Sequence, residues 1–186
     1  DRTGANAKKV VAMMHEKLNT DAVLMQLPIG AGETYAGSVD LITMKALRFM
    51  GDRGEKVVEE EIPADMIDEC QEYRHKMLES LSMYNDEMME LLLSEEEIPE
   101  DLIHKVVKDA VQNQGLTPVF VGSAFKDKAV QPLLDAVCRY LPSPLEREIK
   151  ARKFDNEAER FPLKADPKEP FVGMAFKIVE DTYGQL

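Results

Sequence analysis

The chain has 186 residues, of which 44% are hydrophobic and 31% are charged, and its formal net charge is -12. This length can bury one or two small cores. No apolar run approaches the roughly 20 residues that a membrane-spanning helix needs, which argues against a membrane protein. The two cysteines and three histidines are widely scattered, which argues against a disulfide framework and against a metal site.

The acidic charge is concentrated in one segment. Residues 57–101 contain 16 Asp and Glu against two Lys and Arg, a net charge of -14, and the remaining residues carry a net charge of +2. Such a segment repels phosphate backbones, so we expect it to face proteins rather than nucleic acid. A solvated helical face that keeps the protein soluble is an equally good interpretation of the charge alone.

The first elements read as a helix and a strand. Residues 5–18 predict an amphipathic helix, with one apolar stripe formed by Val10, Val11, Met14 and Leu18. Residues 22–29 form an apolar run with little alternation, which predicts a mostly buried strand.

A small antiparallel sheet is predicted next. Residues 35–43 and 56–62 read as a pair of strands, and the Gly-Asp-Arg-Gly run at residues 51–54 has turn chemistry. Residues 44–50 are ambiguous and could continue the first strand.

Three helices are predicted to follow the sheet. The first begins at residues 63–65, the second covers residues 86–93, and the third covers residues 99–112 with Gly115 as its stop. The first and third carry apolar residues at helical spacing, so we expect each to pack one face inward.

A second strand and helix come after these three. Residues 117–121 predict a buried strand, and residues 127–141 give the clearest helical pattern in the chain. Its apolar residues recur at steps of three and four, which predicts one buried face made of Val130, Leu133, Leu134, Val137, Cys138 and Leu141.

The remainder changes in character. Residues 145–169 are polar and charged without periodicity, which predicts a linker. Residues 170–179 alternate, which predicts a strand that opens a new domain.

Eight short segments, taken in order, carry a family resemblance. They are Asp1 to Asn6, Gln26 to Gly30, Val39 to Ala46, Ile62 to Met66, Gly122 to Lys126, Leu134 to Val137, Tyr140 to Pro144, and Pro170 to Lys177. In this order and spacing the series resembles the elongation factor G family, the translational GTPases that act as ribosomal translocases. The first segment resembles the end of the Asn-Lys-X-Asp motif, and Ser123-Ala124 resembles the loop that closes over guanine.

The resemblance implies an α/β fold built from parts of several domains. Residues 1–25 and 115–145 would be the C-terminal part of a P-loop GTPase domain, and residues 26–114 would be an inserted acidic α+β subdomain. Residues 146–169 would be a linker, and residues 170–186 would contain the first strand of a truncated β-barrel domain. We therefore expect an internal fragment of the family protein.

The same resemblance assigns guanine-binding roles to four residues. The Asp1 carboxylate would accept from the two adjacent N–H donors of guanine, a charge-assisted pair that adenine cannot make. The Ala124 backbone N–H would bind the base carbonyl, the Ser123 hydroxyl would steady the loop or Asp1, and the Lys126 stem would cover the base or ribose. Considered singly, Asp1 is better read as a helix cap and Ser123-Ala124 as a common strand-to-helix turn; the whole series favours the guanine-binding roles.

The resemblance also implies a protein partner for the acidic segment. Its helices meet the C-terminal domain of the ribosomal stalk protein, and the candidate contacts are Glu69, Glu72, Glu79 and Glu87. The chain departs from the family at Met83, where an acidic residue is typical. The ribosome is then the implied partner, with ribosomal RNA contacted through other domains, and the implied location is the cytoplasm or an organellar matrix.

The parent protein would bind GTP or GDP with Mg²⁺ and hydrolyse GTP. The 186 residues contain no Gly-X4-Gly-Lys-Ser/Thr loop, so we predict that this chain alone neither hydrolyses GTP nor binds it measurably, and no catalytic residue is assigned. Apolar faces left uncovered would favour a homodimer. The alternatives are a ribosome-recycling or tetracycline-protection paralogue, and a non-catalytic acidic interaction module.

Overall fold

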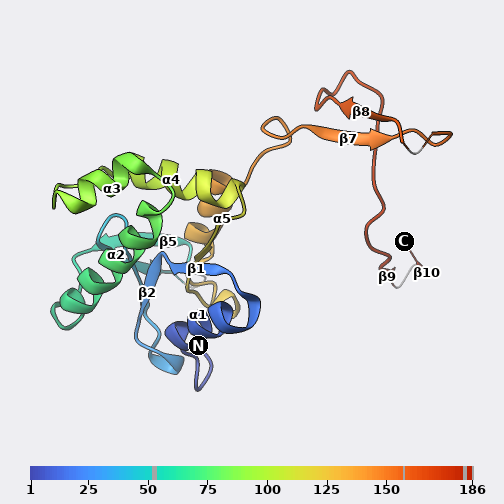
Figure 1. The fold of residues 1–186 in the computed structure, drawn as a ribbon. Coiled ribbons are helices and arrows are strands. Elements are labelled where there is room, and N and C mark those ends of the chain that lie inside the picture. Colours follow the sequence, from blue (N-terminus) through green and yellow to red (C-terminus); the bar gives the residue numbers. More distant parts are fainter. Residues whose placement is uncertain (52–53, 157, 182–183, 186) are drawn as a thin grey trace. The chain divides into compact units, whose positions relative to one another are not determined.

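The computed structural model describes residues 1–51, 54–156, 158–181 and 184–185 (Figure 1). The chain forms two compact units, Asp1–Leu141 and Pro142–Leu186. Among the described residues, no helix combines the length and apolar character needed to cross a membrane.

The first unit contains a short parallel strand pair. Strand β1 (Asp21–Leu24) lies beside β6 (Leu116–Val119), in a register that matches Asp21 with Leu116. Helix α1 (Ala7–Leu18) leads into β1, and α5 (Val130–Tyr140) follows β6 through the short helix η3 (Ala124–Lys126). The expected helix–strand pieces at the two ends of this unit are therefore present.

The run at residues 22–29 is two strands rather than one. It breaks at Met25, and its second half, β2 (Gln26–Ile29), belongs to a different sheet. The Met25 N–H donates to the Val119 carbonyl at 2.9 Å, and its own carbonyl accepts from the Leu41 N–H at 3.0 Å. Met25 thus bonds to both sheets. The single-strand prediction was wrong because apolar periodicity does not reveal a change of pairing partner.

The second sheet is antiparallel, with the order β2-β3-β4-β5. Its other strands are β3 (Gly37–Asp40), β4 (Lys45–Met50) and β5 (Lys56–Glu60). The strands predicted at residues 35–43 and 56–62 do not pair with each other, because the ambiguous residues 44–50 form the strand between them. The predicted turn at residues 51–54 includes residues 52 and 53, which lie outside the described residues.

The reversal between β3 and β4 explains why residues 44–50 form a separate strand. The Asp40 carboxylate accepts from the Ile42 N–H at 2.8 Å and the Thr43 N–H at 3.1 Å. Met44 then adopts a left-handed backbone with φ of 54°. Asp side chains favour such turns by bonding to the backbone two residues later.

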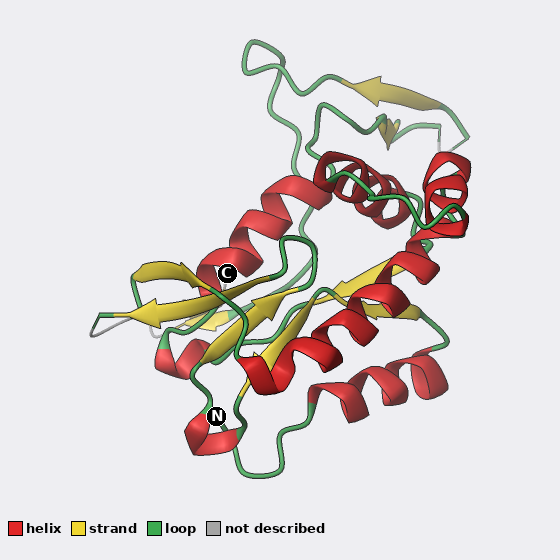
Figure 2. Ribbon diagram, turned by 90° about the vertical axis from the view of Figure 1, so that its left-hand side faces the viewer, coloured by secondary structure: helices red, strands yellow, loops and turns green. Residues whose placement is uncertain are grey.

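The three helices after the sheet lie close to their predicted positions. They are α2 (Ile67–Ser82), entered through the short helix η2 (Ala64–Met66), then α3 (Asp86–Leu93) and α4 (Glu100–Gln112). The Asn85 side chain caps α3 by accepting from the Met88 N–H at 2.9 Å. These helices contribute much of the core, through Cys70, Met77, Leu81, Met88, Ile103, Val106 and Val107. Figure 2 shows helices packed around the strands of this unit.

Helix α4 ends shortly before the predicted glycine stop. Gln114 takes the left-handed conformation, with φ of 59°, and the Gly115 N–H then donates to the Ala110 carbonyl at 2.9 Å. Gly115 is needed for another reason: a Cβ placed there would lie 2.6 Å from Cε1 of Tyr84. The glycine therefore makes room for an aromatic ring instead of supplying the positive φ.

Most of the apolar face predicted to be buried on α5 is exposed. Leu133, Leu134, Val137 and Leu141 are between 43% and 57% exposed, while the buried side chains are Ala136 and Tyr140. On α1, Val10 and Leu18 are exposed as well. The predicted apolar residues do lie along one face of each helix, but their periodicity does not show whether another element packs on that face. Helix α5 packs against α4 through a different face.

The second unit departs from its sequence prediction. The residues predicted as a linker form a hairpin of β7 (Ile149–Arg152) and β8 (Arg160–Leu163). The strand predicted at residues 170–179 does not form, because those residues have no ladder partner in the described part of the chain, and a strand requires one. Two-residue strands follow, β9 (Glu180–Asp181) and β10 (Gly184–Gln185).

Candidate functional site

The loop after β6 is a closed turn centred on Ser123. The Ser123 N–H donates to the Lys128 carbonyl at 3.0 Å, and the Lys128 N–H returns a bond of 3.0 Å to the Ser123 carbonyl. The same Ser123 carbonyl accepts from the Lys126 N–H at 3.1 Å. Asp127 closes the turn with φ of 53°, a conformation that Asp tolerates better than most residues. The loop is therefore held by backbone hydrogen bonds.

This arrangement leaves the Ala124 backbone N–H available on the loop. Ala124 is exposed, and its N–H makes no hydrogen bond within the described ranges. Lys126 is exposed beside it. The Ser123 hydroxyl is buried and lacks a partner among the described residues, so it does not bond to Asp1. The Ser123 side chain lies beneath the loop, whereas Ala124 offers its amide to the outside.

Asp1 lies at a cavity of about 290 Å³ beside the end of β6. Asn6 and Tyr35 line the same cavity, together with the backbone from Val119 to Gly122. Asp1 and Gly122, the residue before Ser123, thus line the same cavity. Ser123, Ala124 and Lys126 do not line this cavity, so the four predicted guanine-binding residues are not gathered in one pocket.

Three of the four predicted docking glutamates have a cationic or potentially cationic neighbour. Glu69 accepts from Lys8 of α1, Glu72 accepts from Lys76 one turn along α2, and the Glu79 carboxylate lies 3.3 Å from Nε2 of His75. The hydrogen bond from Lys76 lowers the pKa of Glu72, and the bond to Glu69 raises the pKa of Lys8.

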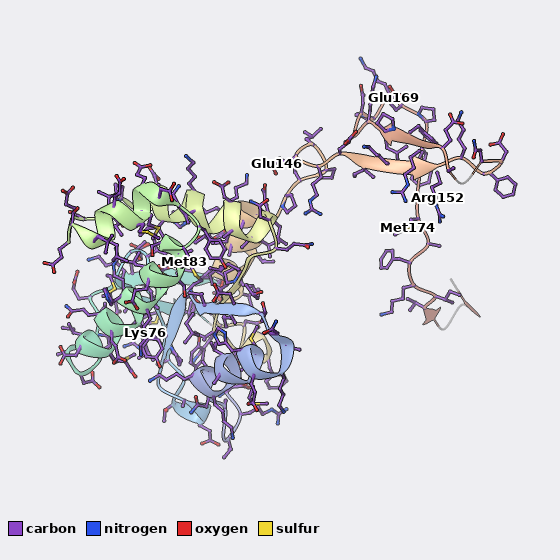
Figure 3. The ribbon with its side chains drawn as sticks, in the orientation of Figure 1. Lys76, Met83, Glu146, Arg152, Glu169 and Met174 are labelled. Atoms are coloured by element: carbon purple, nitrogen blue, oxygen red, sulfur yellow. The ribbon has the colours of Figure 1, made fainter. Side chains whose placement is uncertain are left out.

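Glu87 differs from these three. It is exposed in the first turn of α3, and no ion pair to it is found in the described part of the chain. Met83, which is 75% exposed, lies between α2 and α3, and Figure 3 labels both it and Lys76 of α2. The exposed connection between these helices thus combines an unpaired carboxylate with an apolar side chain.

The sequence did not lead us to Tyr73, an aromatic ring that lies beside both Lys8 and Lys76. The Lys8 and Lys76 ammonium nitrogens lie 5.1 Å and 4.8 Å from the centre of the Tyr73 ring. The three-residue spacing of Tyr73 and Lys76 on one helix could have indicated half of the arrangement. Lys8 comes from a distant helix, so no local pattern points to it. No group of three His, Cys, Asp or Glu residues suited to a metal ion occurs among the residues described.

Comparison with known proteins gives matches that cover the whole of this chain. The chain is 60% identical over 186 residues to elongation factor G of Rhodopirellula baltica, and 44% identical over 187 residues to elongation factor G 1 of Desulfotalea psychrophila. The chain is similar throughout to a segment of elongation factor G. It spans 27% of the length of each of these relatives. No protein-family profile matches the chain.

The elongation factor G likeness covers the whole chain, so it includes both the Asp1 segment and the loop at Ser123 and Ala124. A solved structure also resembles the fold: the crystal structure of ttk003000868 from Thermus thermophilus, with a TM-score of 0.66 and 21% identity. That likeness covers 98% of this chain and 28% of the other. At this identity it supports the mixed α/β fold alone.

Proposed function

We propose that this chain is part of an elongation factor G, which uses GTP hydrolysis to drive tRNA–mRNA translocation on the ribosome. The observation that carries the proposal is 60% identity across the entire chain to a protein of that name. GTP or GDP and Mg²⁺ belong to the parent protein, which works in the cytoplasm or, in an organellar form, in the matrix. The matched relatives carry the elongation factor name, so the paralogue and interaction-module alternatives gain no support.

The chain's domain organisation follows from that proposal. Residues 1–25 and 115–145 are assigned to the GTP-binding domain, and residues 26–114 to the inserted subdomain. The change of sheet at Met25 and the start of β6 at Leu116 support these boundaries. The two strands of the parallel pair, β1 and β6, lie outside residues 26–114, whereas the antiparallel sheet and its helices lie within them. Residues 170–186 are assigned to the start of a further domain.

Within the parent protein, Asp1 and Ala124 contact the base. The Asp1 carboxylate accepts from the guanine ring N–H and exocyclic amine, and the unpaired Ala124 N–H donates to the base carbonyl. Lys126, exposed after Ala124, covers the base with its stem. The buried Ser123 hydroxyl, which has no partner among the described residues, does not reach the nucleotide.

An Asp1→Asn substitution in the full-length factor tests this role. The amide cannot accept from both guanine donors, so we expect GDP affinity to fall about 100-fold. Affinity for xanthosine diphosphate, which carries a carbonyl in place of the amine, should rise instead, because the Asn amide can donate to that carbonyl whereas the Asp carboxylate repels it. Equilibrium titration with fluorescent analogues of the two nucleotides measures both affinities. If the variant prefers GDP to xanthosine diphosphate as strongly as the native factor does, Asp1 does not contact the base.

The chain alone is proposed to be inactive. It contains no phosphate-binding Gly-X4-Gly-Lys-Ser/Thr loop, and phosphoryl transfer depends on such groups and on the metal for charge stabilisation. We expect no GTP hydrolysis and no saturable GDP binding at low micromolar concentration. Saturable binding would show that half of the pocket is sufficient.

The acidic helices are proposed to contact the C-terminal domain of the ribosomal stalk protein. The net charge of -14 over residues 57–101 supports this by steering a basic partner and repelling RNA. Glu69 is tied to Lys8, so we place the centre of the contact at Glu79, Met83 and Glu87. Ribosomal RNA is contacted through other domains.

An NMR titration of the chain with that stalk domain tests the contact. Chemical-shift changes should cluster where α2 ends and α3 begins. They should disappear at high salt, because exposed charges are screened within about 3 Å at 1 M. Glu87→Gln should weaken binding more than Glu69→Gln. If a well-folded sample shows no chemical-shift changes, the acidic residues form a solvated surface and do not bind the stalk domain.

The uncovered α5 stripe is proposed to pair two copies of the isolated chain. Leu133, Leu134, Val137 and Leu141 are each more than 40% exposed along one helix. Contiguous apolar patches of this kind mark interaction sites in soluble proteins. Sedimentation of the chain at about 100 µM tests the homodimer.

A further inference from the structure

The loop between β6 and α5 has two halves with different surroundings. In the first half, Ala124, Phe125 and Lys126 are exposed, and the Ala124 N–H is the group assigned above to the base carbonyl. The second half, residues 127–131, contacts the antiparallel sheet, whose strands come much earlier in the chain. The loop is thus free on the side proposed for the nucleotide and supported on the other.

Two side chains of the second half donate hydrogen bonds to backbone carbonyls next to the sheet. Nζ of Lys128 lies 3.2 Å from the carbonyl oxygen of Tyr35, shortly before β3. Nε2 of Gln131 lies 2.9 Å from the carbonyl oxygen of Gly54, shortly before β5. Both bonds are partly buried, and they tie the loop to residues 93 and 77 positions earlier in the chain. Because a partly buried carbonyl is costly to leave unpaired, these bonds resist separation of the loop from the sheet.

Packing contacts support the same half of the loop. Ala129 is 5% exposed and shares one apolar cluster with Leu47 and Phe49 of β4. Gly54 lies so close to the loop that a Cβ placed on it would be 2.4 Å from the Asp127 carbonyl oxygen. Glycine allows this approach, and it also adopts the left-handed φ of 59° found there without strain. The sheet and the loop therefore fit together without an intervening side chain at this point.

These contacts supply a restraint that the loop's own hydrogen bonds do not. The bonds between Ser123 and Lys128 lie within the loop, so they fix its shape and not its position relative to Asp1. A recognition group must be held to within about 0.5 Å of its productive position, which requires support from neighbouring elements. The contacts of Lys128 and Gln131 with the sheet begin only four residues after Ala124, close enough to give that support.

We propose that Lys128 and Gln131 are positioning residues for guanine recognition, which hold the Ala124 N–H in place through their bonds to the antiparallel sheet. This inference rests on the base contacts proposed above. Neither side chain touches the nucleotide, and both act through the loop. Asp1 lies outside the loop, so its contact with the exocyclic amine of guanine does not depend on them.

Three nucleotides bound by the full-length factor separate these two contacts. Thioguanosine diphosphate carries sulfur, a weak acceptor, in place of the base carbonyl oxygen that faces Ala124, and inosine diphosphate lacks the amine that faces Asp1. We expect the native factor to prefer GDP over the thio analogue about tenfold. Lys128→Met and Gln131→Met should each reduce that preference to about threefold or less. The preference for GDP over inosine diphosphate should stay as it is.

Equilibrium competition against a fluorescent GDP analogue measures both preferences in each variant. Lys128→Arg, which keeps a donor for the Tyr35 carbonyl, should retain the native preference over the thio analogue. Lys105→Met and Gln71→Met, at exposed positions of α4 and α2, are matched controls that should change neither preference.

The proposal is overturned if Lys128→Met and Gln131→Met keep the native preference over the thio analogue. It is also overturned if they lose both preferences equally, because that result indicates general damage to the nucleotide site. A native factor that does not distinguish GDP from the thio analogue would instead disprove the Ala124 base contact itself, and the positioning role with it. The failure of this inference and the failure of the proposed base contact therefore give different results.

Discussion

Nδ1 of His104 lies 2.7 Å from the hydroxyl oxygen of Tyr140, and this contact joins α4 to α5. The imidazole is partly buried, its plane is tilted by 34° to the phenol ring, and Arg139 lies on its other side. Burial and then the Arg139 charge lower the pKa of His104, although Asp40, Glu100 and Asp101 oppose this. The neutral imidazole is therefore the form that the fold prefers.

The first prediction follows from that preference. A depressed pKa in the folded state means that the unfolded chain binds the proton more readily, so stability should fall as pH decreases below the ordinary value of 6.5. The loss continues down to the folded-state pKa. Thermal unfolding of the native chain and of His104→Gln between pH 7.5 and about 5 checks this. The native melting temperature should drop more steeply than that of the variant, and parallel profiles would contradict it.

The second prediction concerns the pairing of Lys8 with Glu69. Both side chains are about 40% exposed, so Glu69→Gln should cost only about 0.5 kcal/mol of unfolding free energy. The loss should shrink in 1 M salt because exposed charges are screened. Denaturant unfolding measures it, with Glu90→Gln as a control on an exposed glutamate of α3. A loss above about 2 kcal/mol would mean that the pair is more buried than the structure shows.

The third prediction concerns the space at Gly115. A Cβ there would lie 2.6 Å from the Tyr84 ring, whose hydroxyl oxygen lies 2.9 Å from the Asp21 carboxylate and 2.8 Å from the Gly115 carbonyl, the two acceptors within reach of its proton. Gly115→Ala should displace the ring and cost about 1–3 kcal/mol.

A double-mutant cycle isolates this clash. In a Tyr84→Ala background the ring is gone, so Gly115→Ala should cost little. Equal losses in both backgrounds would show that the cost comes from the backbone and not from the ring. Gln114→Gly is a useful comparison, because it relaxes the left-handed residue and should be neutral or stabilising.

The fourth prediction concerns the exposed stripe of α5. Leu134 is 57% exposed, so Leu134→Glu should change the unfolding free energy by no more than about 0.5 kcal/mol. The same change should disrupt the proposed homodimer, which sedimentation velocity would report as a smaller species. Ala136→Glu, at a buried position, should instead unfold the chain. If Leu134→Glu sediments as the native chain does, the apolar stripe of α5 takes no part in a dimer contact.

The sequence alone determined most of the helices. Residues 86–93 were predicted as a helix and form α3, α2 begins close to its predicted start, and α4 begins and ends close to its predicted residues. Helix signals are local: caps such as Asn85 and apolar spacing act within one or two turns. The likeness to elongation factor G was also readable from the order and spacing of short segments.

Only the tertiary structure decided which elements pair and which faces are covered. The change of sheet at Met25, the place of β4 inside its sheet and the exposed side of α5 each depend on groups distant in the chain. Strand pairing is satisfied by any backbone with matching hydrogen bonds, so a strand's partner is not written in its own residues. The same holds for Lys8, Glu69 and Tyr73, which are brought together by the packing of α1 beside α2.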